Sequence, residues 1–159
     1  MVHEYLCQTV DLRKKGEVSF SQFDCIRKLY ESLPNDIKIG HRNTAAPSNL
    51  FQVNDEECIL DEARQEEYHT ITAKTLWISQ RSRPDIQLAI AYHCTRIKKD
   101  TDTDWAKLKH LMQFIWTWRW LPLIIKMNGN GEMMIYIDGA HMVHMGTRGH
   151  SVLFATMGK

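Results

Sequence analysis

Residues 68–97 read YHTITAKTLWISQRSRPDIQLAIAYHCTRI, a stretch in which Pro84 separates two apolar patterns of helical period. The first pattern predicts a helix from Asp61 to about Arg81. The residue before a proline is disfavoured in the helical region, so this helix has to end there. Proline is well tolerated in a first helical turn, so a new helix can start at Pro84. Its predicted buried face consists of Ile86, Ala89, Ile90, His93, Cys94 and Ile97.

Two elements and a connector precede this helical pair. Residues 5–20 alternate apolar and polar side chains around a polar turn, a pattern typical of a β-hairpin. Ser21 followed by Asp24 resembles a capping box, and predicts the start of a helix that Pro34 ends. Residues 35–60 have no sustained period and contain scattered Gly, Pro, Asn and Ser, so we expect a long connector.

The C-terminal part predicts one more helix and then strands. The stretch DTDTDW at 100–105 supplies N-cap residues and favourable first-turn charge for a helix. Asn and Gly alternate at 128–131, between the apolar runs 121–127 and 132–138, which is a strong hairpin signal. A third strand at 150–156 would complete a meander. We therefore expect an α+β fold with an N-terminal β-hairpin, about four helices and a C-terminal antiparallel β-meander.

Composition indicates an ordinary globular chain. The 159 residues are 43% hydrophobic and 25% charged, and the net charge is +1. This balance gives no overall electrostatic attraction to nucleic acid or to membranes. The four cysteines form no CxxC pair, so we expect buried or free thiols in a reducing compartment rather than a zinc site or a disulfide framework. No signal peptide and no apolar stretch of about 18 residues is present, which predicts an intracellular chain.

Asp138 ends an apolar run and precedes Gly139, and two interpretations of it are open. It fits a Mg²⁺ ligand of a nuclease-type site, or a strand-ending residue that makes a turn with Gly139. Magnesium sites for phosphate chemistry assemble several carboxylates, and no Asp or Glu follows, so the turn is favoured. His141, His144 and His150 could hold a transition metal, but no cysteine lies nearby. We expect these histidines to lie on a loop without a metal.

Basic and aromatic residues suggest contacts with nucleic acid. The basic residues at the ends of the two consecutive helices are Arg81, Arg83, Lys98 and Lys99. They could contact a phosphate backbone, or they could be solvated residues that favour the helix dipole. Residues 114–121, FIWTWRWL, could form a base-stacking platform with Arg119. Packing of the helix end on a sheet explains the same tryptophans and is favoured.

The blocks of the chain also follow one another in a recognisable order. They are YLCQTVDL at 5–12, GEVSFSQ at 16–22, IRKLYESLP at 26–34, TAAPSNLF at 44–51, the opening stretch, DWAKLKHLMQFIWTWRWLPL at 104–123, and YIDGAHMVHMGTRGHSVLFATMGK at 136–159. In this order they resemble the region after the polymerase active site of copia-type retrotransposon polyproteins. That region runs through the thumb and connection into the start of RNase H. Cys7 stands where this family has Gly, and Ala45 where it often has Pro.

The resemblance implies a division into two parts. Residues 1–120 would belong to the C-terminal region of a reverse transcriptase, and 121–159 to the truncated start of an RNase H-like domain. Asp138 would be the first RNase H carboxylate, in a site left incomplete because the other metal-binding carboxylates are absent from this chain. The parent enzyme, an RNA-directed DNA polymerase with RNase H activity, uses Mg²⁺, and none is expected for this chain alone.

The resemblance also implies partners and a location. The partners are an RNA–DNA hybrid or template–primer duplex and the remainder of the Pol polyprotein, with no membrane; the location is the cytoplasm, in a virus-like particle, or the nucleus. We expect a catalytically incomplete chain that holds duplex through backbone contacts from the four basic residues. The alternative is a domesticated or accidental open reading frame that acts as a helical interaction protein without nucleic-acid function. A small metal-dependent nuclease built on Asp138 is a third hypothesis, which the missing carboxylates disfavour.

Overall fold

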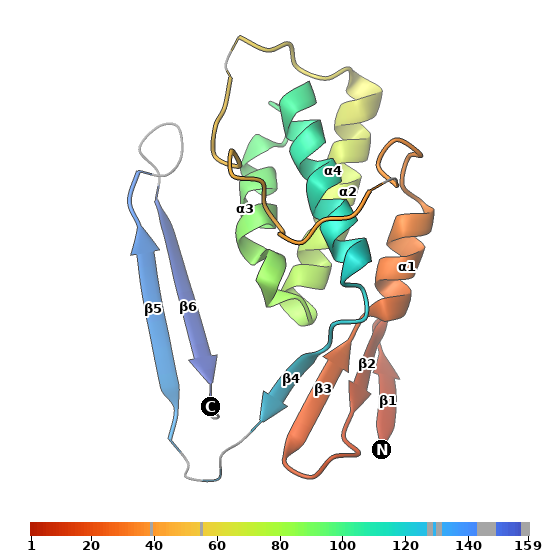
Figure 1. The fold of residues 1–159 in the computed structure, drawn as a ribbon, viewed down its shortest axis with the longest axis vertical. Coiled ribbons are helices and arrows are strands. Elements are labelled where there is room, and N and C mark those ends of the chain that lie inside the picture. Colours follow the sequence, from red (N-terminus) through yellow and green to blue (C-terminus); the bar gives the residue numbers. More distant parts are fainter. Residues whose placement is uncertain (39, 55, 127–128, 130–131, 143–148, 157–159) are drawn as a thin grey trace.

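The computed structural model describes residues 1–38, 40–54, 56–126, 129, 132–142 and 149–156. Within these residues the chain has the predicted α+β fold, with a four-stranded antiparallel sheet, four α-helices and a separate two-stranded antiparallel sheet (Figure 1). The strands are β1 (Val2–Tyr5), β2 (Gln8–Asp11), β3 (Glu17–Ser21), β4 (Leu123–Lys126), β5 (Met134–Ala140) and β6 (His150–Thr156). The helices are α1 (Phe23–Glu31), α2 (Glu62–Arg81), the 3₁₀ turn η1 (Pro84–Ile86), α3 (Gln87–Arg96) and α4 (Asp102–Thr117).

The N-terminal sheet has the order β1-β2-β3-β4, and its two central strands confirm the predicted hairpin. β1 extends this hairpin by a strand that the sequence did not predict. β4 pairs with β3, where Val18 lies opposite Ile125. At one end of this pair Glu17 and Lys126 form a 2.8 Å ion pair. Apolar cross-strand contacts and one ion pair therefore join residues 123–126 to the N-terminal part of the chain.

This pairing corrects the predicted hairpin between 121–127 and 132–138. An Asn-Gly signal indicates a turn but does not specify which strands pair, and the edge of β3 offers N–H and C=O groups that need a partner. The predicted turn at 128–131 lies outside the described residues apart from Gly129. β4, which the resemblance assigns to the RNase H-like part, thus hydrogen-bonds with the first part of the chain.

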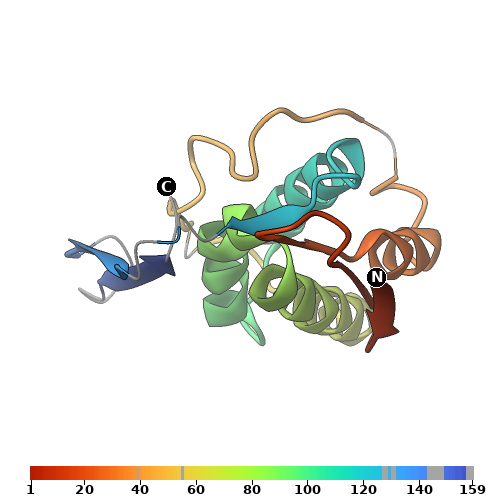
Figure 2. The ribbon, with the colours of Figure 1, turned by 90° about the horizontal axis from the view of Figure 1, so that it is seen from below.

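The last two strands form a ribbon of their own. β5 and β6 pair antiparallel, with Met134 opposite Thr156 and Ala140 opposite His150. Figures 1 and 2 show this ribbon to one side of the helices. Of the predicted meander, the described residues therefore contain one antiparallel pair, and its predicted first strand belongs to the other sheet.

Local signals predicted from the sequence start three of the helical segments. The Asp61 carboxylate accepts a hydrogen bond from the Arg64 N–H at 3.0 Å and begins α2. Thr101 and Asp104 form a reciprocal capping box at the start of α4. Pro84 begins η1, which leads directly into α3. α2 and α3 therefore lie beside each other in opposite directions (Figure 1).

α1 begins differently from the prediction. Ser21 still belongs to β3, where it pairs with Thr9, and the N-cap position is Gln22. The Gln22 side chain makes no capping hydrogen bond, and its oxygen instead accepts one from the Ser82 hydroxyl at 2.8 Å. The predicted capping box was wrong because the strand pairing uses the serine. The bond from Ser82 ties the start of α1 to the turn between α2 and α3.

The hydrophobic core lies between the four helices and the connector. Ile90, at the centre of the predicted face of α3, is 1% exposed, which confirms the register of that helix. The connector contributes Ile37, Leu50 and Leu60 to the same core, although its sequence shows no period. Each large aliphatic side chain that is fully buried stabilises the fold by roughly 1.5–3 kcal/mol. The long connector is therefore a packed part of the fold.

Candidate nucleic-acid interface

An open groove of about 1060 Å³ runs between the helical part and the β5–β6 ribbon. One wall comes from the turn between α2 and α3 and from β4, and the other wall comes from β5 and β6. Its polar and aromatic lining includes Gln80, Arg81, Gln87, Lys126, Tyr136 and Phe154. Most of the remaining lining is apolar, including Leu123, Ile125 and Met133, so the groove sets two basic side chains within a mainly apolar surface, opposite aromatic ones. The sequence did not predict it, because its walls come from separate parts of the chain.

Arg81 is the exposed last residue of α2 and lines the groove. Its guanidinium carbon lies 4.4 Å from the centre of the Trp77 ring. Its carbonyl accepts a hydrogen bond from the Gln8 side chain at 3.1 Å. None of the ion pairs within the described residues involves Arg81. An exposed guanidinium of this kind is suited to a phosphate group.

Lys126 is the second basic residue of the groove, and it forms an ion pair with Glu17 of the neighbouring strand β3. Glu17 lies 2.8 Å from Lys126 and 2.8 Å from Lys14. The hydrogen bonds from these two lysines lower the pKa of Glu17, with the Lys126 bond as the larger cause. The carboxylate therefore neutralises part of this wall, and Arg81 is left as the stronger site for an anion.

Arg83 lies two residues after Arg81 but is 1% exposed. Its Nε and Nη2 atoms donate to the Asp85 carboxylate at 2.8 and 2.7 Å, and Nη1 donates to the Trp118 carbonyl at 3.0 Å. The guanidinium thus joins the turn between α2 and α3 to the end of α4. A phosphate backbone cannot reach this buried group, which removes Arg83 from the predicted phosphate contacts.

Lys98 and Lys99 follow α3 and are exposed. Because α2 and α3 run in opposite directions, these lysines lie at the far end of the helical pair from Arg81. The ten residues of α3 span about 15 Å at about 1.5 Å of rise per residue, and the three of η1 add about 6 Å at about 2.0 Å per residue, so the two ends are about 20 Å apart. The structure therefore does not bring the predicted basic residues together in one cluster.

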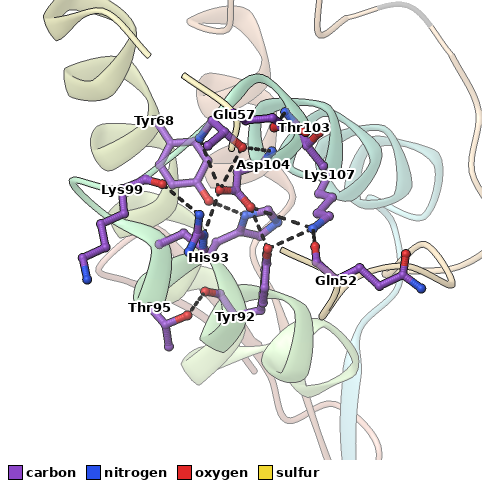
Figure 3. A network of polar contacts seen from close by, with 12 residues as sticks. Gln52, Glu57, Tyr68, Tyr92, His93, Thr95, Lys99, Thr103, Asp104 and Lys107 are labelled. Atoms are coloured by element: carbon purple, nitrogen blue, oxygen red, sulfur yellow. Dashed lines mark hydrogen bonds and ion pairs between the residues drawn. The ribbon is translucent and has the colours of Figure 1, made fainter. Parts of the chain in front are cut away.

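A buried polar network holds the loop that carries these lysines (Figure 3). The Asp104 carboxylate accepts hydrogen bonds from the Tyr92 hydroxyl at 2.6 Å and from Arg96 Nε at 2.8 Å. It also accepts one from the Thr101 N–H at 3.2 Å. Arg96 Nη2 donates to the Lys99 carbonyl at 2.9 Å. One buried carboxylate thus fixes the path of the chain from α3 into α4.

The same network buries a lysine and a histidine. Lys107 Nζ donates to the Tyr92 hydroxyl at 2.9 Å and to the Gln52 carbonyl at 2.5 Å, and burial lowers the pKa of Lys107. The Tyr68 hydroxyl lies 2.6 Å from His93 Nδ1, and burial lowers the pKa of His93 to about 3. These groups are enclosed by the helices and the connector. We therefore assign the network a structural role.

Asp138 lies within β5, where it pairs with Val152 of β6. The strand continues to Ala140, so the predicted strand end at Asp138 was two residues too early. One carboxylate oxygen accepts a hydrogen bond from the Gly139 N–H at 2.8 Å. Side chains alternate between the two faces of a strand, so Asp138 shares a face with Tyr136. Tyr136 lines the groove, and the acidic residue therefore belongs to the groove side of the ribbon.

A magnesium site needs several oxygen ligands, and the described residues do not supply them around Asp138. In the described part of the chain, no three His, Cys, Asp or Glu side chains are placed to hold a metal ion together. His141 is exposed, His144 lies outside the described residues, and only the backbone of His150 is described. The described residues therefore do not fit a Mg²⁺ ion, and no metal-dependent step follows from them.

The aromatic run at the end of α4 forms a stack with α1. Tyr30 and Trp116 lie face to face with ring centres 3.9 Å apart, and Phe23 and Trp120 do so at 3.8 Å. The Arg119 guanidinium lies over both tryptophans, 4.3 Å from the centre of Trp116 and 5.3 Å from that of Trp120. Packing, the favoured interpretation, accounts for Trp116, whose partner is α1 and not a sheet, whereas Trp118 and Trp120 remain 43% and 62% exposed.

Comparisons of the chain with protein families, with curated proteins and with solved structures found no match. Among the helices that the structure describes, none is both long and apolar enough to cross a bilayer. Of the predicted site residues, Arg81 lines the groove, whereas Asp138 lies on β5, the strand whose Tyr136 lines the other wall, and is not itself part of the lining. Any assignment of function therefore depends on the groove and on the order of the sequence blocks.

Proposed function

We propose that the chain is part of a copia-type reverse transcriptase–RNase H polyprotein and that it holds an RNA–DNA duplex through phosphate contacts. The observation that carries this proposal is the groove, with Arg81 on one wall and the Asp138 face of β5 on the other. A nucleic-acid backbone seated against Arg81 would pass along the strand that resembles the first strand of RNase H. The order of the sequence blocks supports the same assignment.

The spacing of the exposed basic residues suits a single duplex. About 20 Å separates Arg81 from the loop with Lys98 and Lys99, and a strand of B-form duplex advances about 3.4 Å along its axis per nucleotide. An RNA–DNA hybrid has A-like geometry and rises less per base pair, so a hybrid that lies along α3 would contact both ends over at least about six base pairs. Contacts of this kind set the position of a duplex without reading its sequence, so we expect no base preference.

Salt dependence of binding tests this proposal. The anisotropy of a labelled RNA–DNA hybrid, measured across a salt series, gives the slope of log K against log salt concentration. Three phosphate contacts, from Arg81, Lys98 and Lys99, give a slope of about −2.7, at about 0.9 per contact. Arg81→Gln should reduce the magnitude of this slope by about 0.9. Lys28→Gln, on the exposed side of α1, should leave the slope unchanged. A slope near zero, or equal losses in both variants, would contradict the proposal.

An interaction protein without nucleic-acid function is the second candidate, and the observation that favours it lies in the β5–β6 ribbon, not in the helices. Ile137 is 76% exposed and Leu153 is 65% exposed, and the two residues pair on one face of the ribbon. Asp138 is the one carboxylate in these two strands, which contain no lysine or arginine. Exposed apolar surface of this kind marks protein-interaction sites. This candidate is favoured if the chain self-associates in sedimentation experiments and the hybrid does not bind at low salt.

A further inference from the structure

The loop between α3 and α4 holds one residue in a strained conformation. Lys98 has a φ of 68°, in the left-handed region that side chains other than those of Gly, Asn and Asp rarely adopt. Two hydrogen bonds close the loop around it. The Lys99 N–H donates to the Arg96 carbonyl at 2.8 Å, and Arg96 Nη2 donates to the Lys99 carbonyl at 2.9 Å. Contacts with Arg96 therefore maintain the closed loop against the preference of its own backbone.

Asp100 follows the two exposed lysines of this loop, but its own side chain is enclosed. The residue is 0% exposed. Its carbonyl accepts a hydrogen bond from the Leu60 N–H of the connector at 2.9 Å, and Ile59 pairs with Thr101 beside it. Neither oxygen of the Asp100 carboxylate has a hydrogen-bond partner among the described residues. A carboxylate buried in this way is costly when it is ionised and much less so when it carries a proton.

The charged and titratable groups around this carboxylate are engaged elsewhere. They are Glu57 of the connector, Tyr68 of α2, Arg96 of α3, Asp104 of α4 and, on the loop itself, the exposed Lys98 and Lys99. Arg96 already pairs with Asp104 at 2.8 Å. Glu57 accepts a hydrogen bond from the Thr103 hydroxyl at 2.6 Å, and the Tyr68 hydroxyl lies 2.6 Å from His93 Nδ1. The packing of the loop thus leaves the Asp100 carboxylate without a counter-ion of its own.

We propose that Asp100 is a proton-operated latch that regulates the phosphate contacts of Lys98 and Lys99. With a proton on the carboxyl group, the loop stays closed and holds both lysines in a fixed position. When the proton leaves to water, the carboxylate becomes hydrated by moving outwards, and the loop opens and releases the strain at Lys98. No other covalent bond changes. This regulation rests on the proposed function, because the lysines act on a phosphate backbone.

The direction of the pH dependence follows from the surroundings of Asp100. Burial raises its pKa above the ordinary aspartate value of 3.8, and the Asp104 charge adds to this rise. The backbone N–H groups of Lys98 and Asp100 and the Arg96 charge offset part of it. The closed loop is therefore most favoured below pH 3.8, and it loses this advantage as the pH rises through the raised pKa. Between these two values the ratio of open to closed loop should rise by up to about tenfold per pH unit.

The first experiment follows the opening of the loop in the full chain without nucleic acid. Hydrogen–deuterium exchange of the peptide that contains residues 97–101, corrected for the intrinsic pH dependence of exchange, is measured from about pH 4 to about pH 8. In the wild-type chain we expect opening to increase with pH and then to level off. Asp100→Asn, which is neutral at every pH, should show no such increase. The matched control Asp102→Asn replaces a side chain that is 82% exposed, and it should keep the wild-type pH dependence.

Melting temperatures of the same samples provide a second measure. At neutral pH Asp100→Asn should melt above the wild-type chain, since it removes a buried charge without a counter-ion, and the difference should disappear as the pH falls towards 3.8. Asp102→Asn should not melt above the wild-type chain. It removes a favourable charge from the first turn of α4 and an ion pair with Arg64.

The second experiment measures the affinity of the RNA–DNA hybrid over the same pH range. We expect the affinity of Asp100→Asn, relative to that of the wild-type chain, to rise over the pH interval in which the wild-type loop opens. Loop exchange that does not depend on pH, or that keeps its pH dependence in Asp100→Asn, would overturn the latch whether or not the hybrid binds. A pH-dependent loop with a constant ratio of affinities would overturn its role in binding. Failure of the hybrid to bind at any pH would contradict the proposed function instead, and the exchange data would still decide on the latch.

Discussion

Arg83→Met is expected to destabilise the fold, whereas Arg81→Met is expected to leave its stability unchanged. Arg83 is 1% exposed and donates two hydrogen bonds to the Asp85 carboxylate and one to the Trp118 carbonyl. Methionine fills much of the same volume, but it leaves the Asp85 carboxylate without its counter-ion and the Trp118 carbonyl with one donor, the Leu121 N–H, in place of two. At Arg81 the same change removes a contact with the exposed Trp77 ring and little else from the folded chain.

The size of the effect follows from these three bonds. Removing one partner of a buried ion pair costs about 3–5 kcal/mol. The Asp85 side chain is 33% exposed, so solvent recovers part of that cost. The Trp118 carbonyl keeps its hydrogen bond from the Leu121 N–H at 3.1 Å, so the loss of its second donor adds only about 0.5–1.5 kcal/mol. We expect a net loss of about 3 kcal/mol, which lowers the melting temperature of a chain of this size by about 6–12 °C. For Arg81→Met we expect a loss below about 0.5 kcal/mol.

Urea unfolding followed by tryptophan fluorescence, and thermal unfolding followed by circular dichroism, measure both variants against the wild-type chain. The same samples in the hybrid-binding assay separate the two roles, because Arg81→Met should weaken binding without changing the melting temperature. If Arg83→Met melts at the wild-type temperature, or if Arg81→Met is the less stable of the two, the assignment of Arg83 to the fold and Arg81 to the surface is refuted.

Three further predictions concern the core, the aromatic stack and the buried histidine. Ile90→Asp should unfold the chain, since a buried unpaired charge costs several kcal/mol against a total stability of about 5–15 kcal/mol; a native circular-dichroism spectrum would contradict the helix register. Trp120→Ala should lower the free energy of unfolding in urea by roughly 1–2 kcal/mol more than Trp118→Ala, because only Trp120 stacks on Phe23; equal losses would contradict the stack. Burial lowers the pKa of His93 in the folded chain to about 3, below the ordinary histidine value of 6.5, so the unfolded state takes up the proton first. Stability should therefore fall as the pH drops from about 6.5 towards 3, by up to about 1.4 kcal/mol per pH unit, and His93→Gln should flatten this slope; an unchanged slope would contradict the burial of a neutral histidine.

The helices could be predicted from the sequence because their signals act over short distances. Asp61, Pro84 and the Thr101–Asp104 pair each act within about one helical turn, so their effect does not depend on the rest of the fold. Apolar spacing placed Ile90 in the core for the same reason. Ser21 failed as a cap because pairing with a distant strand keeps that residue in β3.

Contacts between distant segments could not be predicted in this way. The turn signal after residue 127 is local, whereas β4 pairs with β3 from the start of the chain. Lys126 therefore could not be placed beside the groove. Arg81 and Arg83 look alike in the sequence, and only packing against the end of α4, at Trp118, buries one of them. The groove likewise exists only once its separate segments are folded together.

The most direct test of the proposed groove is to determine where nucleic acid contacts the chain. An RNA–DNA hybrid that carries thiouridine is photo-cross-linked to the full chain, and mass spectrometry identifies the linked peptides. We expect cross-links in the segment that contains Trp77 and Arg81 and in the segment that contains Tyr136, because these segments line or adjoin the groove. Arg81→Gln should remove most of them. Cross-links confined to α1 or to the connector, and unchanged by Arg81→Gln, would contradict the assignment of this groove to duplex binding.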